Sequence, residues 1–172
     1  MLEFLDPLGG SRKLAMTESL SIELRNAVSS EAAALSALAK RSKAHWPYSP
    51  DHLAQWHDDL TVTEQTIADT HCTVVLMHGQ LAGYYVLDPR RSPWSLEHFW
   101  VDPEHMGRGV GRALLEHAVA QARAGAASAI SIDSDPYAEP FYLACGAQRV
   151  GELSSPISGQ PARIRPQLRL PL

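Results

Sequence analysis

The chain has 172 residues, of which 45% are hydrophobic and 20% charged, as is typical of one globular domain and not of a disordered chain. Fifteen basic residues against nineteen acidic ones leave a formal charge of -4, which lacks the basic excess typical of nucleic-acid-binding proteins. The two cysteines, Cys72 and Cys145, supply neither a disulfide framework nor a zinc quartet. No apolar run approaches the roughly 18 residues of a membrane span, and residues 1–16 lack the pattern of a signal peptide. We therefore expect a cytoplasmic protein that binds neither nucleic acid nor membranes.

The first residues lack the pattern of the rest of the chain. Residues 1–18 contain Pro7 and a pair of glycines and show no apolar period. We interpret them as a loose leader before a single domain that spans 19–172. Met16 is a plausible alternative start, because patterned sequence begins just after it.

From there on, two kinds of pattern predict helices interleaved with strands. Alternating apolar residues and β-branched runs predict strands, which in chain order cover 20–28, 73–77, 81–87, 95–101, 129–132, 148–153 and 163–170. Apolar residues three or four positions apart, with good helix formers between them, predict helices over 31–45, 51–60, 109–124 and 138–144. This order implies a mixed α/β fold built in layers.

Local signals refine three of these elements. Ser29 or Ser30 is expected to cap the first helix. Gly79 is expected to turn the second strand into the third, which makes a hairpin. Pro166 indicates that the last strand lies at a sheet edge or contains a bulge.

A glycine-rich turn between the predicted strand 95–101 and the predicted helix 109–124 is the most informative segment. Gly107, Gly109 and Gly111 occupy every second position there. Bare backbone N–H groups at the positive end of a helix form an anion site, and glycine permits close approach or a positive φ. The segment lacks the Lys-Ser/Thr pair of a P-loop, and its spacing departs from the Rossmann fingerprint. A phosphate-binding turn and a tight turn without a ligand both remain open.

Two motifs resemble those of the GCN5-related N-acetyltransferase (GNAT) superfamily. Residues 106–111 (MGRGVG) fall in register with its acyl-CoA motif Gln/Arg-x-x-Gly-x-Gly/Ala. Residues 135–147 (DPYAEPFYLACGA) resemble its block Asn-x-x-Ala-x-x-Phe-Tyr-x-x-x-Gly-Phe. Residues 99–103 (FWVDP) resemble its fourth strand, and the whole resemblance covers about 20–170.

The resemblance implies a fold and an activity. The fold is an α/β (α+β) single domain with a mixed, mostly antiparallel sheet flanked by helices, in which the fourth and fifth strands splay apart. The activity is that of an acyltransferase which moves an acetyl group from acetyl-CoA, as co-substrate, directly to an amine of a small molecule, without a metal. Acylation of a protein or peptide N-terminus and a non-catalytic CoA-binding regulatory module are the alternatives, and a homodimer is left open.

The resemblance also implies which residues bind the cofactor. The glycine-rich turn would hold the pyrophosphate, and amides freed where the fourth strand splays would face the pantetheine and thioester. Two positions depart from the family, because Met106 replaces a polar residue and Asp135 replaces the common Asn. The implied cofactor-binding residues are Phe99, Trp100, Val101, Met106, Gly107, Arg108, Gly109, Val110, Gly111, Arg112, Asp135, Ala138 and Phe141.

Two catalytic residues follow from the same resemblance. Tyr142 stands where the family often places its general acid, and a phenol with a pKa of about 10 can protonate a thiolate. Glu97 lies near where related enzymes carry an acidic base or a water-relay residue. His98, with an ordinary pKa of about 6.5, is the rival base. The period of two predicts that Glu97 and His98 point to opposite faces, with Leu96 and Trp100 on the side of His98.

The acceptor pocket is the least defined part of the site. In the family the connection between the first two helices usually walls it, which here is 42–49. Trp46 and Tyr48 are candidates for an aromatic slot, Lys43 for attracting an anionic acceptor, and His98 for a further contact. Ordinary packing is the alternative for both aromatic rings. The eight histidines show no metal-ligand spacing.

Overall fold

The computed structural model describes residues 22–172, so the predicted leader and the start of the domain at residue 19 lie outside the described residues. The strands are β1 (Ile22–Asn26), β2 (His71–Met77), β3 (Gln80–Asp88), β4 (Trp94–Val101), β5 (Ala129–Asp133), β6 (Gln148–Ser154) and β7 (Ile164–Pro171). The helices are α1 (Ala32–Ala44), α2 (Pro50–Gln55), α3 (Glu64–Asp69), α4 (Val110–Ala124) and α5 (Glu139–Ala144), with 3-10 turns η1 (Ser29–Glu31) and η2 (Pro103–His105).

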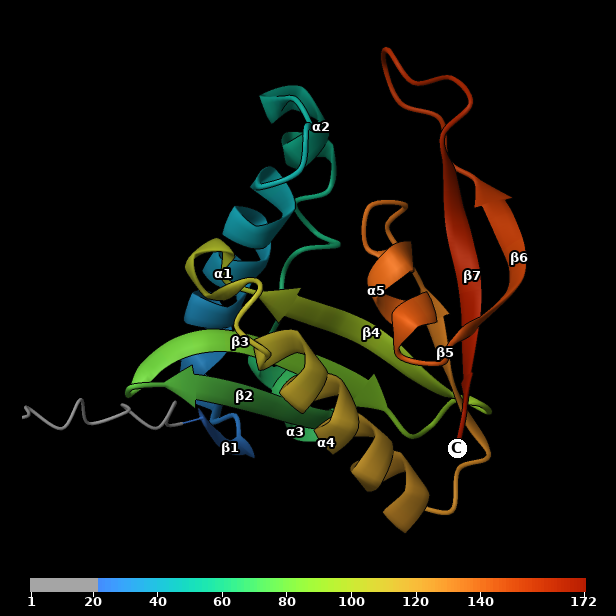
Figure 1. Ribbon diagram of the computed structural model, residues 1–172. Helices are drawn as coiled ribbons and strands as arrows, with labels where there is room; N and C mark the ends of the chain where they lie inside the picture. Colours follow the sequence, from blue (N-terminus) through green and yellow to red (C-terminus); the bar gives the residue numbers. More distant parts are fainter. Residues whose placement is uncertain (1–21) are drawn as a thin grey trace, which may run out of the picture.

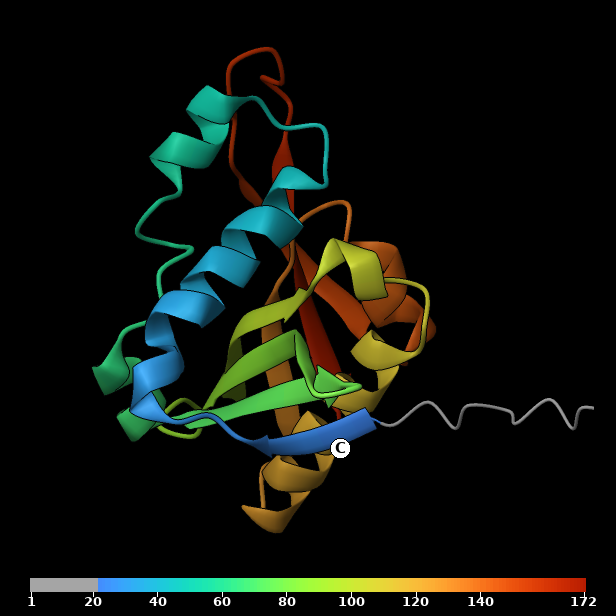
Figure 2. The same ribbon diagram turned by 90° about the vertical axis from the view of Figure 1, so that its left-hand side faces the viewer.

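The strands form one seven-stranded sheet in the order β1-β2-β3-β4-β5-β7-β6. Every neighbouring pair is antiparallel except β4 and β5, which are parallel. Figures 1 and 2 show α1 and α4 on opposite faces of this sheet. The predicted mixed, mostly antiparallel sheet flanked by helices is therefore confirmed.

The alternation of β3 supplies both layers of the core. Tyr84 and Val86 pack with α1, whereas Tyr85 and Leu87 pack with α4. The residues of these two clusters are almost fully buried, which is where most of the stabilisation from apolar burial arises. None of the helices within 22–172 combines the length and apolar character that crossing a membrane needs.

The contact between β4 and β5 is short, and it opens the site. The two strands pair only from Trp94 to Leu96, opposite Ile130 to Ile132. Beyond Leu96 they diverge, and α5 lies beside the opening (Figure 1). The predicted splayed pair of strands is thus confirmed.

A β-bulge at Glu97 changes which side chains of β4 point to each face of the sheet. Val86 pairs with His98, but the next β3 residue, Leu87, pairs with Leu96, so Glu97 is an extra residue on β4. Leu96 consequently packs on the α4 side of the sheet, whereas Trp100 packs on the α1 side. The prediction that Leu96 shares a face with Trp100 is wrong, because the extra residue inverts the alternation.

The start of the first helix also differs from the prediction. Ser29 and Ser30 lie in η1 and do not cap α1. Glu31 precedes the helix instead, and its carboxylate accepts the Val28 N–H at 2.9 Å. The same carboxylate pairs with Arg25 of β1 at 2.8 Å, and no side chain caps the first turn of α1.

Three further local predictions had mixed outcomes. Gly79 does turn β2 into β3, since His78 and Gly79 both have positive φ (51° and 76°), as a two-residue hairpin loop requires. The predicted helix 51–60 ends at Gln55, and α3 was not predicted. The strand that contains Pro166 lies inside the sheet and not at its edge, although Pro166 stands just beyond the last pair with β5.

Candidate active site

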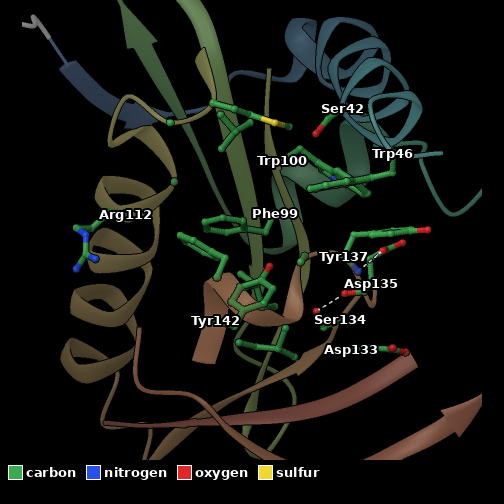
Figure 3. Close-up of a pocket in the computed structure, with 18 of the residues that line it drawn as sticks. Ser42, Trp46, Phe99, Trp100, Arg112, Asp133, Ser134, Asp135, Tyr137 and Tyr142 are labelled. Carbon is green, nitrogen blue, oxygen red and sulfur yellow. Dashed lines mark hydrogen bonds between the residues drawn. The ribbon is translucent and has the colours of Figure 1, made fainter. Parts of the chain in front are cut away.

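A cavity of about 440 Å³ lies where β4 and β5 diverge, against the N-terminus of α4 (Figure 3). All but two of the expected cofactor-binding residues line it. Val110 is excluded because its side chain is buried in the core, and Arg108 is exposed outside the cavity. Arg112 lines the edge of the cavity, and Figure 3 shows its guanidinium on the side of α4 away from the other labelled residues.

The glycine-rich turn opens this cavity to an anion. Gly107 and Gly109 have φ of 74° and 83°, a left-handed conformation that glycine adopts without strain. Within α4 the Ala113 N–H is the first to donate, to the Gly109 carbonyl at 3.0 Å, so the N–H groups of the preceding first turn have no partner in the helix. Together with the helix dipole, these free N–H groups fit a phosphate or pyrophosphate.

Backbone groups of β4 face the same cavity. The Asp102 N–H donates to the Ala82 carbonyl of the adjacent strand segment at 2.8 Å. Because the direction of backbone groups alternates along a strand, Trp100 also directs its N–H to β3. Phe99 and Val101 therefore direct theirs to the opening, while Trp100 contributes its indole ring. The expected set of free amides contains two members in this geometry and not three.

Tyr142 of α5 places a neutral phenol at the cavity wall. Its side chain packs edge-on against Phe99 and Phe141, with ring centroids 5.7 and 5.2 Å away, and the residue is 5% exposed. Its hydroxyl has no hydrogen-bond partner within the described part of the chain and points into the cavity (Figure 3). Burial raises the pKa of Tyr142, so the phenol keeps its proton at neutral pH.

A second cavity, of about 410 Å³, adjoins the first. The two cavities share Leu96, Glu97, Trp100, Asp133 and Asp135 in their walls. The exposed Glu97, on the bulge of β4, therefore stands at the junction of the two cavities. A carboxylate placed there can take a proton from a group that enters from either side.

His98 lines the second cavity but is already engaged. The Trp100 indole N–H donates to its Nδ1 at 3.2 Å. Burial lowers the pKa of His98, against the opposing influence of Glu97 and Asp59, so the ring is neutral and carries its proton on Nε2. With the Nδ1 lone pair in use, the ring has no free lone pair for a second proton. Of the two candidate bases, Glu97 is the one that the geometry leaves available.

A buried cluster of charges joins α1 to Arg163, the residue just before β7, through Asp135. Its Oδ2 accepts from the Lys43 ammonium and from the Tyr48 hydroxyl (2.8 Å), with Arg163 Nη2 at 3.5 Å. Its Oδ1 accepts the Tyr137 N–H at 2.9 Å. Burial alone would raise the pKa of Asp135, but Lys43 and these hydrogen bonds hold that pKa below its usual value.

The cluster changes the roles expected from the sequence. Lys43 is ion-paired and buried, so it is not a free cation awaiting an acceptor. Tyr48 is buried with its hydroxyl on Asp135 and lines neither cavity. Trp46 stacks on Tyr137, with ring centroids 5.3 Å apart, and lines the first cavity rather than the second.

Three further aromatic or cationic residues in the walls of the second cavity, Trp56, Arg163 and Arg165, are ones that the sequence did not single out. Trp56 contacts two cations, with Lys43 Nζ at 4.5 Å and Arg163 Cζ at 5.2 Å from its ring centroid. Arg165 lines the cavity as well. Nothing in the local pattern around these positions distinguishes them from ordinary helix-end or strand residues. Within 22–172, no group of three His, Cys, Asp or Glu side chains is placed to hold a metal ion.

A splayed strand pair, an amide cradle at the start of a long helix and a neutral phenol beside it thus meet at one cavity of an α/β fold. The model of the acetyltransferase (GNAT) domain family matches residues 45–154, and the chain belongs to that family. The family resemblance seen in the sequence is thereby confirmed. A search of curated proteins found no match.

Solved structures share the fold. The PaiA N-acetyltransferase from Thermoplasma acidophilum, in complex with coenzyme A, is 15% identical, with a TM-score of 0.71 over 89% of this chain and 100% of that one. A GCN5-related N-acetyltransferase from Rhodopseudomonas palustris is 21% identical, with a TM-score of 0.73 over 90% and 98%. The yncA protein from Salmonella typhimurium, with its cofactor acetyl-CoA, is 16% identical, with a TM-score of 0.65 over 88% and 94%.

Proposed function

We propose that this protein transfers an acetyl group from acetyl-CoA directly to the amine of a small molecule. The observation that carries the proposal is a single cavity that has an amide cradle at one end and the Tyr142 phenol in its wall. Two of the structural neighbours were solved with coenzyme A or acetyl-CoA, which supports the same cofactor here.

The residues present fit this cofactor. The free N–H groups of the first turn of α4 suit the pyrophosphate, and the Phe99 and Val101 amides suit the pantetheine and the thioester. Ala138 and Phe141 supply apolar walls. Because the cradle consists of backbone groups, the replacement of a polar residue by Met106 leaves it intact.

Bound acetyl-CoA supplies an activated thioester carbonyl. The amine enters from the second cavity and passes Glu97, which takes the proton of the ammonium. The β4 amides polarise the carbonyl oxygen while the new C–N bond forms and the C–S bond breaks. Tyr142 then donates its proton to the departing sulfur, which leaves as the free thiol. The acylated nitrogen releases its second proton to solvent, and solvent returns a proton to the Tyr142 phenolate.

The test is the release of free thiol from acetyl-CoA in the presence of a broad panel of amines. We expect thiol release that depends on an amine, together with a matching acetylated product by mass spectrometry. Tight acetyl-CoA binding without amine-dependent thiol release would instead favour a non-catalytic CoA-binding module. Product formed only on peptide N-termini would instead favour acylation of a protein or peptide N-terminus.

A further inference from the structure

One wall of the second cavity carries an unbalanced charge. Lys43, Arg163 and Asp135 meet there, and their side chains are 10%, 3% and 10% exposed. Two cations thus face one carboxylate in a place nearly closed to water. The neighbouring pair of Arg165 and Asp133, 3.2 Å apart, balances itself and is more exposed. An excess buried charge is costly unless a counter-charge completes the cluster.

Arg163 is also short of hydrogen-bond acceptors. Its Nη1 donates to the backbone and hydroxyl oxygens of Ser155 at 3.2 and 2.8 Å. Its Nη2 makes only long contacts, at 3.4 Å to the Tyr48 hydroxyl and 3.5 Å to Asp135. Its Nε is buried without a partner among residues 22–172. A buried guanidinium normally satisfies more of its donors, so this one is suited to an additional anionic acceptor.

The other part of the cavity has the opposite character. Asp58, Asp59 and Glu97 line it, are exposed, and form no ion pair with any residue in 22–172. Glu97 and Asp59 both raise the pKa of His98, against the larger effect of burial, so they lie near that ring. The cavity therefore offers buried cations and exposed carboxylates, with Glu97 at the junction with the first cavity.

We propose that the acceptor is an amino acid, in which the reacting amine and a carboxylate belong to one small molecule; this rests on the proposed function. The carboxylate would bind at Lys43 and Arg163 and bring the buried cluster to two cations and two anions. The ammonium would lie toward Glu97, next to the thioester. A polyamine lacks a carboxylate and would leave the two cations facing the single carboxylate of Asp135.

The experiment compares acceptors that differ only in the carboxylate. Methionine is paired with 3-(methylthio)propylamine, phenylalanine with phenethylamine and lysine with cadaverine, and spermidine is added as a polyamine. The kcat/KM of each is measured with saturating acetyl-CoA, and the shift in Tm is measured with CoA. In at least one pair we expect the amino acid to exceed its amine by 30-fold or more in kcat/KM and to be the only member that raises Tm.

The outcomes separate the two proposals. If amines are acetylated as well as their amino acids in every pair, or spermidine is best, the amino-acid proposal is wrong while the acetyltransferase stands. If no amino acid is acetylated and none raises Tm, the amino-acid proposal is also wrong. If amino acids raise Tm but no acceptor releases thiol, the acetyl transfer is wrong and the binding site stands.

Variants locate the carboxylate site. Lys43→Met and Arg163→Met each leave one cation facing Asp135, so both are expected to fold, which circular dichroism and acetyl-CoA binding check. Each should reduce the preference for the amino acid over its amine, expressed as the ratio of their kcat/KM values, at least tenfold. Lys40→Met removes a cation from the same helix outside both cavities and should keep the preference. A preference that survives in both cluster variants would overturn the assignment.

Discussion

The Lys43 ammonium and the Asp135 carboxylate form a buried ion pair, although 92 positions separate them in the sequence. The pair ties the C-terminal part of α1 to the segment between β5 and α5. It also accounts for the departure from the family at residue 135, where Asn is common. An amide there would leave Lys43 and Arg163 facing each other without an anion.

Asp135→Asn should therefore destabilise the protein strongly. Breaking a buried ion pair from one side leaves an uncompensated charge and typically costs about 3–5 kcal/mol. The free energy of unfolding in urea measures this cost. Asp133→Asn is the matched control, because its pair with Arg165 is exposed and should contribute about 1 kcal/mol or less. An equal decrease in unfolding free energy in the two variants would contradict the larger stabilisation expected from the buried carboxylate of Asp135.

The stabilisation by Asp135 should depend on pH in a defined direction. Its pKa in the folded protein lies below its ordinary value, which is about 3.9 in the unfolded chain. The contribution is thus complete above about pH 4 and is lost as the pH falls through the lower, folded pKa. The difference in unfolding free energy between wild type and Asp135→Asn should be constant from about pH 7 to 5 and shrink at lower pH. A difference that instead grows toward acid pH would contradict a folded-state pKa of Asp135 below its ordinary value.

Gly109→Val should impair cofactor binding. Gly109 has a φ of 83°, which a β-branched residue cannot adopt without strain of at least about 1–2 kcal/mol. Relief of that strain would move the N–H groups of the cradle, so we expect at least a tenfold loss of acetyl-CoA affinity by calorimetry. Gly159→Val is the control, because Gly159 has a φ of 77°, also with open space around its Cβ position, in the exposed loop between β6 and β7. Unchanged affinity in Gly109→Val would refute the cradle.

Tyr142→Phe should slow the chemical step and leave binding intact. General acid catalysis contributes roughly 10²–10⁴-fold, so kcat should fall by at least tens-fold at unchanged acetyl-CoA affinity. Because burial raises the pKa of Tyr142, no alkaline limb from this phenol should appear below about pH 10 in the wild type. Tyr85→Phe removes another buried phenol, one that contacts His117 Nδ1 at 2.8 Å outside both cavities, and should keep kcat. Wild-type turnover in Tyr142→Phe would transfer the role of acid to another group.

Glu97→Gln should lower kcat/KM and leave acetyl-CoA affinity unchanged. The amide has no carboxylate to accept the proton of the amine, so kcat/KM should fall by roughly 10²-fold or more. Glu23→Gln, on β1 and exposed, is the control. Wild-type kcat/KM in Glu97→Gln together with a loss of this size in His98→Gln would assign the base to His98.

Sequence predicts those features of the fold that neighbouring residues determine, and it misses those that depend on pairing between distant segments. The hairpin at Gly79 follows from two adjacent residues, and the prediction was right. The face of the sheet to which Leu96 points depends on one extra residue in β4 relative to β3. The alternation of apolar residues within β4 does not indicate that extra residue. The six residues of α3 are too few for a clear helical period, although Thr63 caps them by accepting the Thr66 N–H at 3.0 Å.

The site shows the same division. Gly109 and Tyr142 belong to contiguous motifs, and the structure places both at the first cavity. Lys43, Asp135 and Arg163 belong to three separate segments, and only the fold brings them together. A charge cluster of this kind leaves no pattern along the chain. For that reason the sequence indicated the class of chemistry and left the wall of the second cavity undefined.

The seam between β4 and β5 has a mechanical consequence. Three residue pairs join these strands, whereas every other ladder of the sheet has five or more. The sheet thus has two parts, β1 to β4 and β5, β7 and β6, joined by its shortest ladder. A rotation of one part relative to the other would change the width of the opening between β4 and β5 while the hydrogen bonds inside each part stay intact.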